Sequence, residues 1–219
     1  LNSKRHGVKH IPKAVVLTLA LLFCTACGST RQAECVDVLS NTENSRYSFE
    51  LKYEDEKELI AVTDKSSGES FIIPEETFVD ESYSIMSIYP TENYLYYMKG
   101  RNSGVSIYRI KLSDMTREEI IKSSDTADKS ILGLTFSWSD TENRFSAVRL
   151  FTDEKNIYLI DKNGMVFVLN PFAEKITDCT CIIEESVLGG CIFDGKAIYY
   201  IDEDGVQKMY NVVNKTFRI

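Results

Sequence analysis

The sequence predicts an all-β fold of about four repeated units, arranged as a β-propeller-like domain. Strand-forming runs rich in Val, Ile, Tyr and Phe alternate with turns that carry Asp, Asn and Gly. Beyond the N-terminal region, no segment sustains a helical period. A glycine precedes the third strand of each unit, at Gly68, Gly104, Gly164 and Gly205. Two of the three intervals between these glycines are close to the ~40 residues of a propeller blade, and the longer one contains an insertion at 122–146.

The N-terminal region has the organisation of a secretory signal peptide. Residues 1–13 contain four basic residues and no acid, and the apolar run 14–23 follows directly. A permanent transmembrane anchor fits less well, because this run is about half of the ~20 residues that a helix needs to cross a bilayer. We therefore expect residues 1–26 to be a signal peptide.

Residues 23–29, Phe-Cys-Thr-Ala-Cys-Gly-Ser, resemble the lipobox of bacterial lipoproteins, although Cys24 stands where that family usually has leucine. The resemblance implies that Cys27 is lipidated and begins the mature chain. A diacylglycerol thioether plus an N-acyl chain is sufficient for stable membrane attachment. Residues 27–46 are then the lipid anchor and tether, with a short strand expected at 35–39. The domain that follows is expected outside the cytoplasm, tethered to a bacterial membrane.

Charge and composition exclude several functions for such a mature chain. Removal of residues 1–26 takes away four basic residues and no acid, so the formal net charge changes from −8 to −12. This charge disfavours nucleic acid and anionic lipid as partners. The same removal takes away His6 and His10, the two histidines of the chain. The mature chain therefore cannot form a Ser-His-Asp group or an imidazole metal site.

The four units fill a predicted domain at 47–219, and each contains three apolar runs separated by polar turns. Their predicted strands are 49–53, 59–62 and 70–73; 86–89, 94–98 and 105–112; 147–151, 157–160 and 165–169; and 191–193, 197–201 and 206–210. Segment 117–122 fits either an outer strand or one helical turn, and 131–139 fits an additional strand within the insertion. Because propeller loops gather at two mouths, we expect the four glycine turns to form one rim of short acidic turns.

Two phrases of the repeat resemble a known pattern. Tyr94-Leu-Tyr-Tyr-Met98 with Ile107-Tyr-Arg-Ile110, and Ala197-Ile-Tyr-Tyr-Ile-Asp-Glu-Asp-Gly205, are similar to an uncharacterised family of β-propeller-like domains in bacterial lipoproteins. That family is similar in pattern to the blades of low-density lipoprotein receptor propellers. The resemblance covers roughly residues 47–219, and the third and fourth units lack its Tyr-Arg end. It implies a fold and no particular function.

The turns Asp161–Gly164 and Asp202–Gly205 allow two interpretations. Their alternating oxygen ligands and glycine are also found at the start of calcium loops, but no bidentate Glu follows at EF-hand spacing. Asp and Asn before Gly are equally typical of tight hairpins, which we favour. No metal and no cofactor is expected.

The remaining candidate residues are three cysteines and a tryptophan. A disulfide between Cys181 and Cys191 is possible in an oxidising compartment, whereas Cys179, Cys181 and Cys191 with Cys35 form a weak zinc pattern. Structural cysteines, free or paired, are the favoured interpretation. Trp138 fits a core or insertion residue, with a ligand surface as the alternative.

Together these features predict a membrane-anchored binding or interaction module of the cell envelope. Its partner is expected to be an envelope protein or glycan that contacts the insertion at 122–146, including Trp138, since binding residues concentrate on loops of a rigid scaffold. No catalytic residue is identifiable. The alternative is a carboxylate-dependent hydrolase or lyase acting on carbohydrate, but nothing selects a catalytic pair among 33 acidic residues. A purely structural envelope protein is a third hypothesis.

Overall fold

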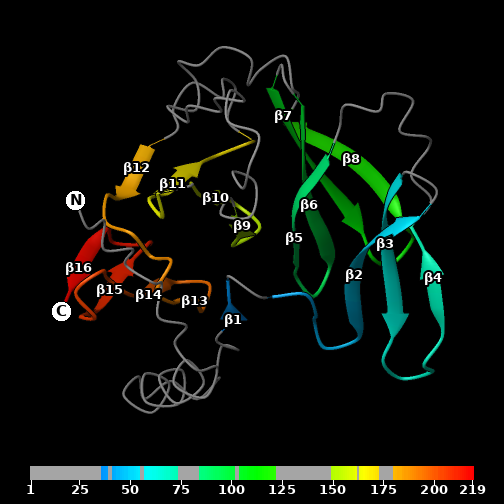
Figure 1. The fold of residues 1–219 in the computed structure, drawn as a ribbon, viewed down its shortest axis with the longest axis horizontal. Coiled ribbons are helices and arrows are strands. Elements are labelled where there is room, and N and C mark those ends of the chain that lie inside the picture. The colour runs from blue at the N-terminus through cyan, green and yellow to red at the C-terminus, as the bar shows by residue number, and fades with distance from the viewer. Residues whose placement is uncertain are drawn as a thin grey trace, which may run out of the picture.

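The computed structural model describes residues 36–38, 41–54, 57–73, 84–101, 104–121, 149–161, 163–172 and 180–219. Within these ranges the regular structure consists of strands β1 to β16, which form four antiparallel sheets (Figure 1). The described ranges contain no helix that is long and apolar enough to cross a membrane. The all-β, propeller-like fold with four repeated units is confirmed.

Each sheet is built from strands that follow one another in the chain, and the fourth also includes β1. The first sheet has β2 (Tyr47–Glu54), β3 (Lys57–Asp64) and β4 (Ser70–Ile72). The second has β5 (Ser84–Pro90), β6 (Tyr94–Arg101), β7 (Gly104–Lys111) and β8 (Thr116–Ile121). The third has β9 (Arg149–Thr152), β10 (Ile157–Ile160), β11 (Val166–Leu169) and β12 (Thr180–Ile183). The fourth has β1 (Val36–Asp37), β13 (Cys191–Phe193), β14 (Ala197–Ile201), β15 (Gln207–Asn211) and β16 (Thr216–Arg218).

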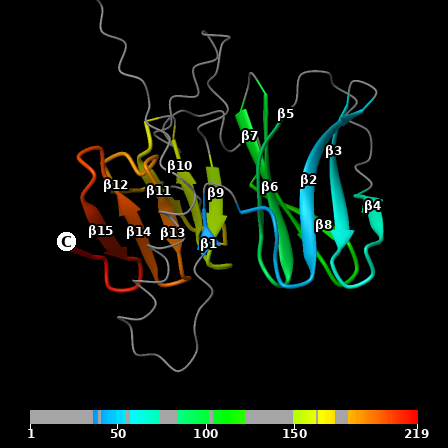
Figure 2. The same cartoon turned by 60° about the horizontal axis from the view of Figure 1, so that its bottom comes forward.

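The core lies between successive sheets, which stand face to face in chain order (Figure 2). Successive side chains of a strand point to opposite faces. In β6, Leu95 and Tyr97 therefore join a cluster with the first sheet, whereas Tyr96 and Met98 join a larger cluster with the third and fourth sheets. All four side chains are fully buried. The uninterrupted apolar run of β6 thus reflects a strand that is covered on both faces.

The predicted strands that fall within the described residues are present. The structure adds strands at the outer edges of the second, third and fourth sheets and at the inner edge of the fourth. Segment 117–122 contributes to a strand, β8, which pairs with β7. β12 and β16 similarly add an outer strand to the third and fourth sheets. Within the segment predicted as tether, β1 pairs with β13, the inner strand of the last sheet. The strand expected at 131–139 lies outside the described residues.

The expectation of one rim carrying all four glycine turns is wrong for Gly68. The amide of Lys65, near Gly68, donates to the Arg46 carbonyl, and the neighbouring Asn44 side chain donates to the Thr91 carbonyl at 2.7 Å. Gly68 therefore lies at the end of the sheets that carries the β5–β6, β9–β10 and β13–β14 turns, which we call rim A. Gly104, Gly164 and Gly205 follow the second strand of their sheets and lie at the opposite end, rim B.

The reason is the direction of β2. It begins at rim A, as β6 does, so β2 corresponds to a second strand and not to a first strand. The sequence prediction counted three strands per unit and therefore treated the turn at Gly68 as the turn between a second and a third strand. Because β2 corresponds to β6, the β3–β4 turn that holds Gly68 corresponds to the β7–β8 turn, which is one turn later in the meander than the turn at Gly104.

A capping residue and an aromatic residue recur at rim A. The side chains of Asn44, Asp153 and Asp194 each accept two backbone N–H bonds from the turn that follows, at 2.6 to 3.0 Å. Thr91 takes the same place and accepts from the Tyr94 amide at 3.1 Å. Five residues after each cap stands an aromatic residue: Phe49, Tyr96, Tyr158 and Tyr199. In the first three sheets this aromatic packs toward the next sheet.

Candidate functional site

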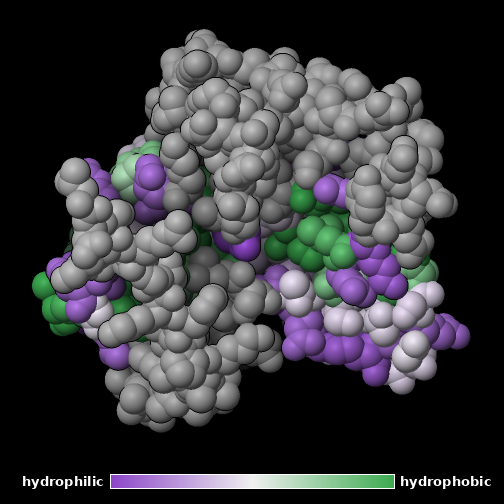
Figure 3. Space-filling model, viewed as in Figure 1, coloured by the Kyte–Doolittle hydropathy of each residue, from purple (hydrophilic) through white to green (hydrophobic). Residues whose placement is uncertain are grey.

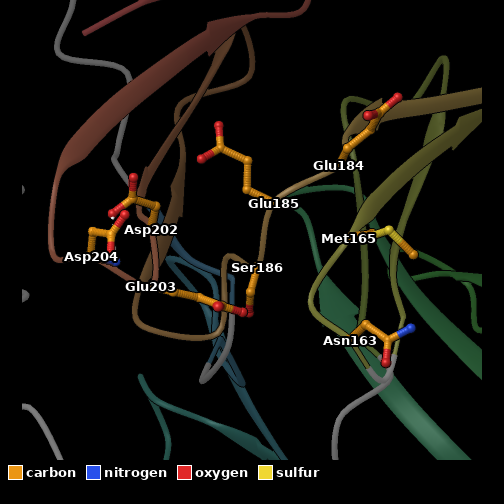
Figure 4. A pocket seen from close by; sticks show the side chains of 8 residues that line it. All are labelled: Asn163, Met165, Glu184, Glu185, Ser186, Asp202, Glu203 and Asp204. Carbon is orange, nitrogen blue, oxygen red and sulfur yellow. Dashed lines mark hydrogen bonds between the residues drawn. The ribbon is translucent and has the colours of Figure 1, made fainter.

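An acidic pocket of about 400 Å³ opens at rim B, between the third and fourth sheets. Three segments line it: the β10–β11 turn, the loop after β12 and the β14–β15 turn. Figure 4 shows their side chains, with Asn163 and Met165 on one side and Asp202 and Asp204 on the other. The lining residues are Asn163, Met165, Glu184, Glu185, Ser186, Asp202, Glu203 and Asp204. Five of these eight carry carboxylates, so the pocket attracts cations.

Two similar turns build the walls of the pocket. Asp161 Oδ1 accepts the backbone N–H groups of Asn163 and Met165 at 2.9 and 2.8 Å. Asp202 Oδ1 accepts those of Asp204 and Val206 at 3.0 and 2.8 Å. Because these oxygens are turned toward their own backbone, the structure supports the hairpin interpretation of both turns. Within the described ranges, no group of three or more His, Cys, Asp or Glu side chains is placed to hold a metal ion.

Gly164 fixes the position of the loop that carries Glu184–Ser186. Its φ of 86° is in the left-handed region, and a Cβ at this residue would lie 2.9 Å from the Cα of Ser186. The Gly164 carbonyl also accepts the Val187 amide at 3.0 Å. The absence of a side chain therefore lets the β10–β11 turn and the loop after β12 approach closely, which places their acidic residues at one pocket.

Lys208, on β15, neutralises part of the pocket wall. Its ammonium group contacts the Glu185 carboxylate and lies 2.9 Å from Asp202 Oδ2. The Tyr200 hydroxyl donates to Glu185 at 2.9 Å. Hydrogen bonding to Lys208 lowers the pKa of Asp202, and the bond to Glu185 raises the pKa of Lys208. Burial, followed by the bond to Glu185, raises the pKa of Tyr200. Glu185, Asp202 and Lys208 thus form one network of ion pairs.

The other carboxylates of the pocket, Glu184, Glu203 and Asp204, have no ion-pair partner in the part of the chain that the structure describes. Their charges remain available to an incoming cationic group. The arrangement is therefore suited to binding a positively charged ligand.

The residues singled out from sequence have different outcomes. Cys27 and Trp138 lie outside the described residues, so lipidation and a ligand surface at Trp138 stay predictions. Cys181, half-buried on β12, and Cys191, buried on β13, belong to different sheets. Burial raises the pKa of Cys181. A disulfide between them likewise stays a prediction.

Sequence reasoning did not find the acidic pocket as a site. It identified the turns Asp161–Gly164 and Asp202–Gly205 separately and did not single out Glu184–Ser186. The available signal was the recurrence of Asp-x-x-Gly in two successive units, since equivalent turns of neighbouring sheets lie at the same rim.

No protein-family model matches the sequence, and no curated protein matches it either. Two solved structures show a distant likeness. One, from a structural and mechanistic study of two prolyl endopeptidases, has a TM-score of 0.46 and 13% identity, over 96% of this chain and 35% of that chain. The other, the tricorn protease, has a TM-score of 0.38 and 10% identity, over 81% of this chain and 18% of that chain. The chain thus spans a minor part of both structures.

Proposed function

We propose that this chain is a lipid-anchored, extracytoplasmic lipoprotein whose propeller-like domain binds a positively charged group of an envelope protein or glycan. The signal peptide at 1–26 and the lipobox-like sequence around Cys27 support the anchor. The blade pattern resembling low-density lipoprotein receptor propellers is part of the same proposal. Catalysis has no part in it.

The observation that carries the binding role is the acidic pocket at rim B, in which Glu184, Glu203 and Asp204 lack a cationic partner among the described residues. The segment that contains Trp138 connects β8 to β9. Ile121 ends β8 and Arg149 begins β9, and both pair with residues near rim B turns. The proposal also includes Trp138, which lies outside the described residues, as a contact with the partner.

Lipidation is tested with Cys27→Ser. We expect this variant to lose labelling by radioactive palmitate and to move from the membrane fraction to the soluble exported fraction. Cys24→Ser serves as the matched control and should remain labelled. Label that persists in Cys27→Ser, or a mature N-terminus at another residue, would overturn the anchor.

Binding is tested with a lysine-rich peptide as the probe. Neutralising three pocket carboxylates, with Glu184→Gln, Glu203→Gln and Asp204→Asn together, should weaken peptide binding about tenfold, because exposed ion pairs contribute ~0.2–1 kcal/mol each. A control with the same change in net charge carries Glu50→Gln, Glu69→Gln and Glu119→Gln, which lie away from the pocket.

The control should bind the peptide nearly as well as the wild type, and Trp138→Ala should weaken binding further in the pocket variant. Equal losses in the pocket variant and the control would mean that net charge, and not the pocket, attracts the peptide. That result would refute the proposed site.

A further inference from the structure

The outer edge of the fourth sheet carries bulky apolar side chains in contact with solvent. Val213, in the β15–β16 turn, is 73% exposed, and Phe217, on β16, is 53% exposed. Figure 3 shows hydrophobic atoms gathered at this C-terminal edge, at the left of the molecule. One side of Phe217 contacts the Tyr210 ring, at 4.7 Å between centroids. This edge is held in place by the sheet and still presents apolar surface outward.

The same edge is basic, in contrast to the net charge of the chain. Residues 207–219 contain no Asp or Glu, whereas the whole chain has a net charge of −8. Lys215 and Arg218 are exposed and have no ion-pair partner in the described ranges. The amide of Val212 donates to the carbonyl of Lys196 at 2.9 Å, which places a further exposed lysine beside the turn. Lys208, by contrast, is held by Glu185 and Asp202.

Basic and bulky apolar side chains on one exposed edge fit the surface of an anionic bilayer. Apolar side chains enter the boundary between headgroups and acyl chains, while Lys and Arg are attracted to the anionic headgroups. A second copy of the chain is a poorer partner for this edge. A symmetric contact would bring Lys215 and Arg218 of one copy close to the same residues of the other.

We propose that Val213, Lys215, Phe217 and Arg218 form a membrane-docking edge that meets an anionic bilayer edge-on, so that side chains from both faces of β16 reach it. The proposal rests on the proposed lipid anchor for the presence of the membrane. Its affinity rests on the positive charge of this edge, which acts against the repulsion between anionic lipid and the net negative charge of the whole mature chain. The geometry also separates the two functional surfaces. Successive turns of a meander alternate between its ends, so the β15–β16 turn lies at rim A and the acidic pocket at rim B, away from the anionic headgroups.

The test uses the proposed mature chain, residues 27–219, with Cys27→Ser so that it carries no lipid. Binding is measured by sedimentation of the protein with vesicles. We expect binding to phosphatidylcholine vesicles that contain phosphatidylglycerol and little binding to vesicles of phosphatidylcholine alone. Changing Lys215 and Arg218 to Gln should weaken binding about 30-fold, because each basic side chain near an anionic surface contributes about a factor of five. Val213→Ser with Phe217→Ser should also reduce binding.

Matched controls carry equivalent changes elsewhere: Lys155→Gln with Lys65→Gln for charge, and Leu188→Ser for an exposed apolar side chain. These should bind the vesicles as strongly as the parent protein does.

Absence of binding to both kinds of vesicle, or equal losses in edge and control variants, would overturn the membrane-docking edge. A dimer in light scattering that Val213→Ser and Phe217→Ser dissolve would also overturn it, in favour of a second copy. Palmitate labelling of Cys27 is independent of these outcomes, so failure of the anchor and failure of the edge can be told apart.

Discussion

Among the described residues, the buried Tyr96 hydroxyl has Arg109 near it but makes no hydrogen bond of normal geometry, whereas its counterparts in the next two sheets each donate to a carboxylate. Tyr158 donates to Asp153 at 3.0 Å and Tyr199 donates to Asp194 at 3.1 Å, in both cases to the cap five residues earlier. In the second sheet this cap is Thr91, whose hydroxyl bonds to Tyr94 and Glu154 instead. The second sheet therefore keeps the tyrosine of the repeat without the acceptor that satisfies it.

We expect Tyr96→Phe to leave the free energy of unfolding unchanged or to raise it. The variant removes a buried polar group whose desolvation costs about 1–3 kcal/mol. The matched change Tyr158→Phe removes a made hydrogen bond and should lower the free energy of unfolding by about 1 kcal/mol. Urea unfolding monitored by circular dichroism measures both. Equal destabilisation of the two variants would show that Tyr96 has a partner such as a buried water.

Asp202 links stability to acidic pH. Its side chain is 8% exposed, and Lys208 lowers its pKa below the ordinary value of 3.8. A carboxyl with a lowered pKa in the folded state stabilises the fold above its unfolded pKa, and this stabilisation is lost as pH falls through the folded pKa. We expect the urea midpoint of Asp202→Asn to be lower than that of the wild type at pH 7.

The difference between Asp202→Asn and the wild type should shrink as pH falls below about 4, where the wild-type carboxyl becomes protonated. Asp204→Asn is the control, because Asp204 lies in the same turn without an ion pair in the described structure. A difference that stays constant from pH 7 to pH 2 would show that Asp202 acts through its turn hydrogen bonds and not through its charge.

At the scale of elements, two glycines with similar φ values differ in their surroundings. Gly164 and Gly205 have φ of 86° and 80°, but an added Cβ meets Ser186 at Gly164 and meets no atom within 4 Å at Gly205. Gly205→Ala should cost about 1–2 kcal/mol of unfolding free energy from backbone strain alone. Gly164→Ala should cost more and should also displace the loop of Glu184–Ser186.

Urea unfolding gives the two stabilities, and binding of the lysine-rich peptide reports the loop. We expect the peptide affinity to fall in Gly164→Ala and to stay near the wild-type value in Gly205→Ala at temperatures where both are folded. Equal costs and equal affinities would contradict the close approach at Gly164.

Local patterns predicted most strands, and long-range geometry decided the rest. β6 and β14 are recognisable because apolar runs flanked by turns are typical of strands covered on both faces. β8 was ambiguous, because Thr116–Ile121 is largely exposed and polar, so its sequence carries no apolar period. The rim position of Gly68 depends on the direction of β2, which is set by packing on the second sheet. The acidic pocket depends on three separate segments meeting, which no local pattern contains.

At the scale of the whole molecule, the four sheets form a row whose two end faces differ. On β2, Ser48 and Glu50 occupy the places that Leu95 and Tyr97 have on β6, counted from the cap at rim A. The outer face of β2 is thus polar. The opposite face of the fourth sheet holds Ile192, Ala197 and Tyr199, all buried. In the described structure, no core cluster joins the first sheet to the fourth.

The pairing of β1 with β13 has a consequence for the order of folding. Asp37 lies near the start of the described chain, and its partner Ile192 belongs to the last sheet. The first three sheets contain contacts between strands that are close in sequence, so each can form soon after its strands emerge. β1 has to wait until the last sheet exists, and joining it closes a loop of nearly the whole domain at a cost in chain entropy. During synthesis from the N-terminus, this pairing is therefore a late event that fastens the beginning of the domain to its end.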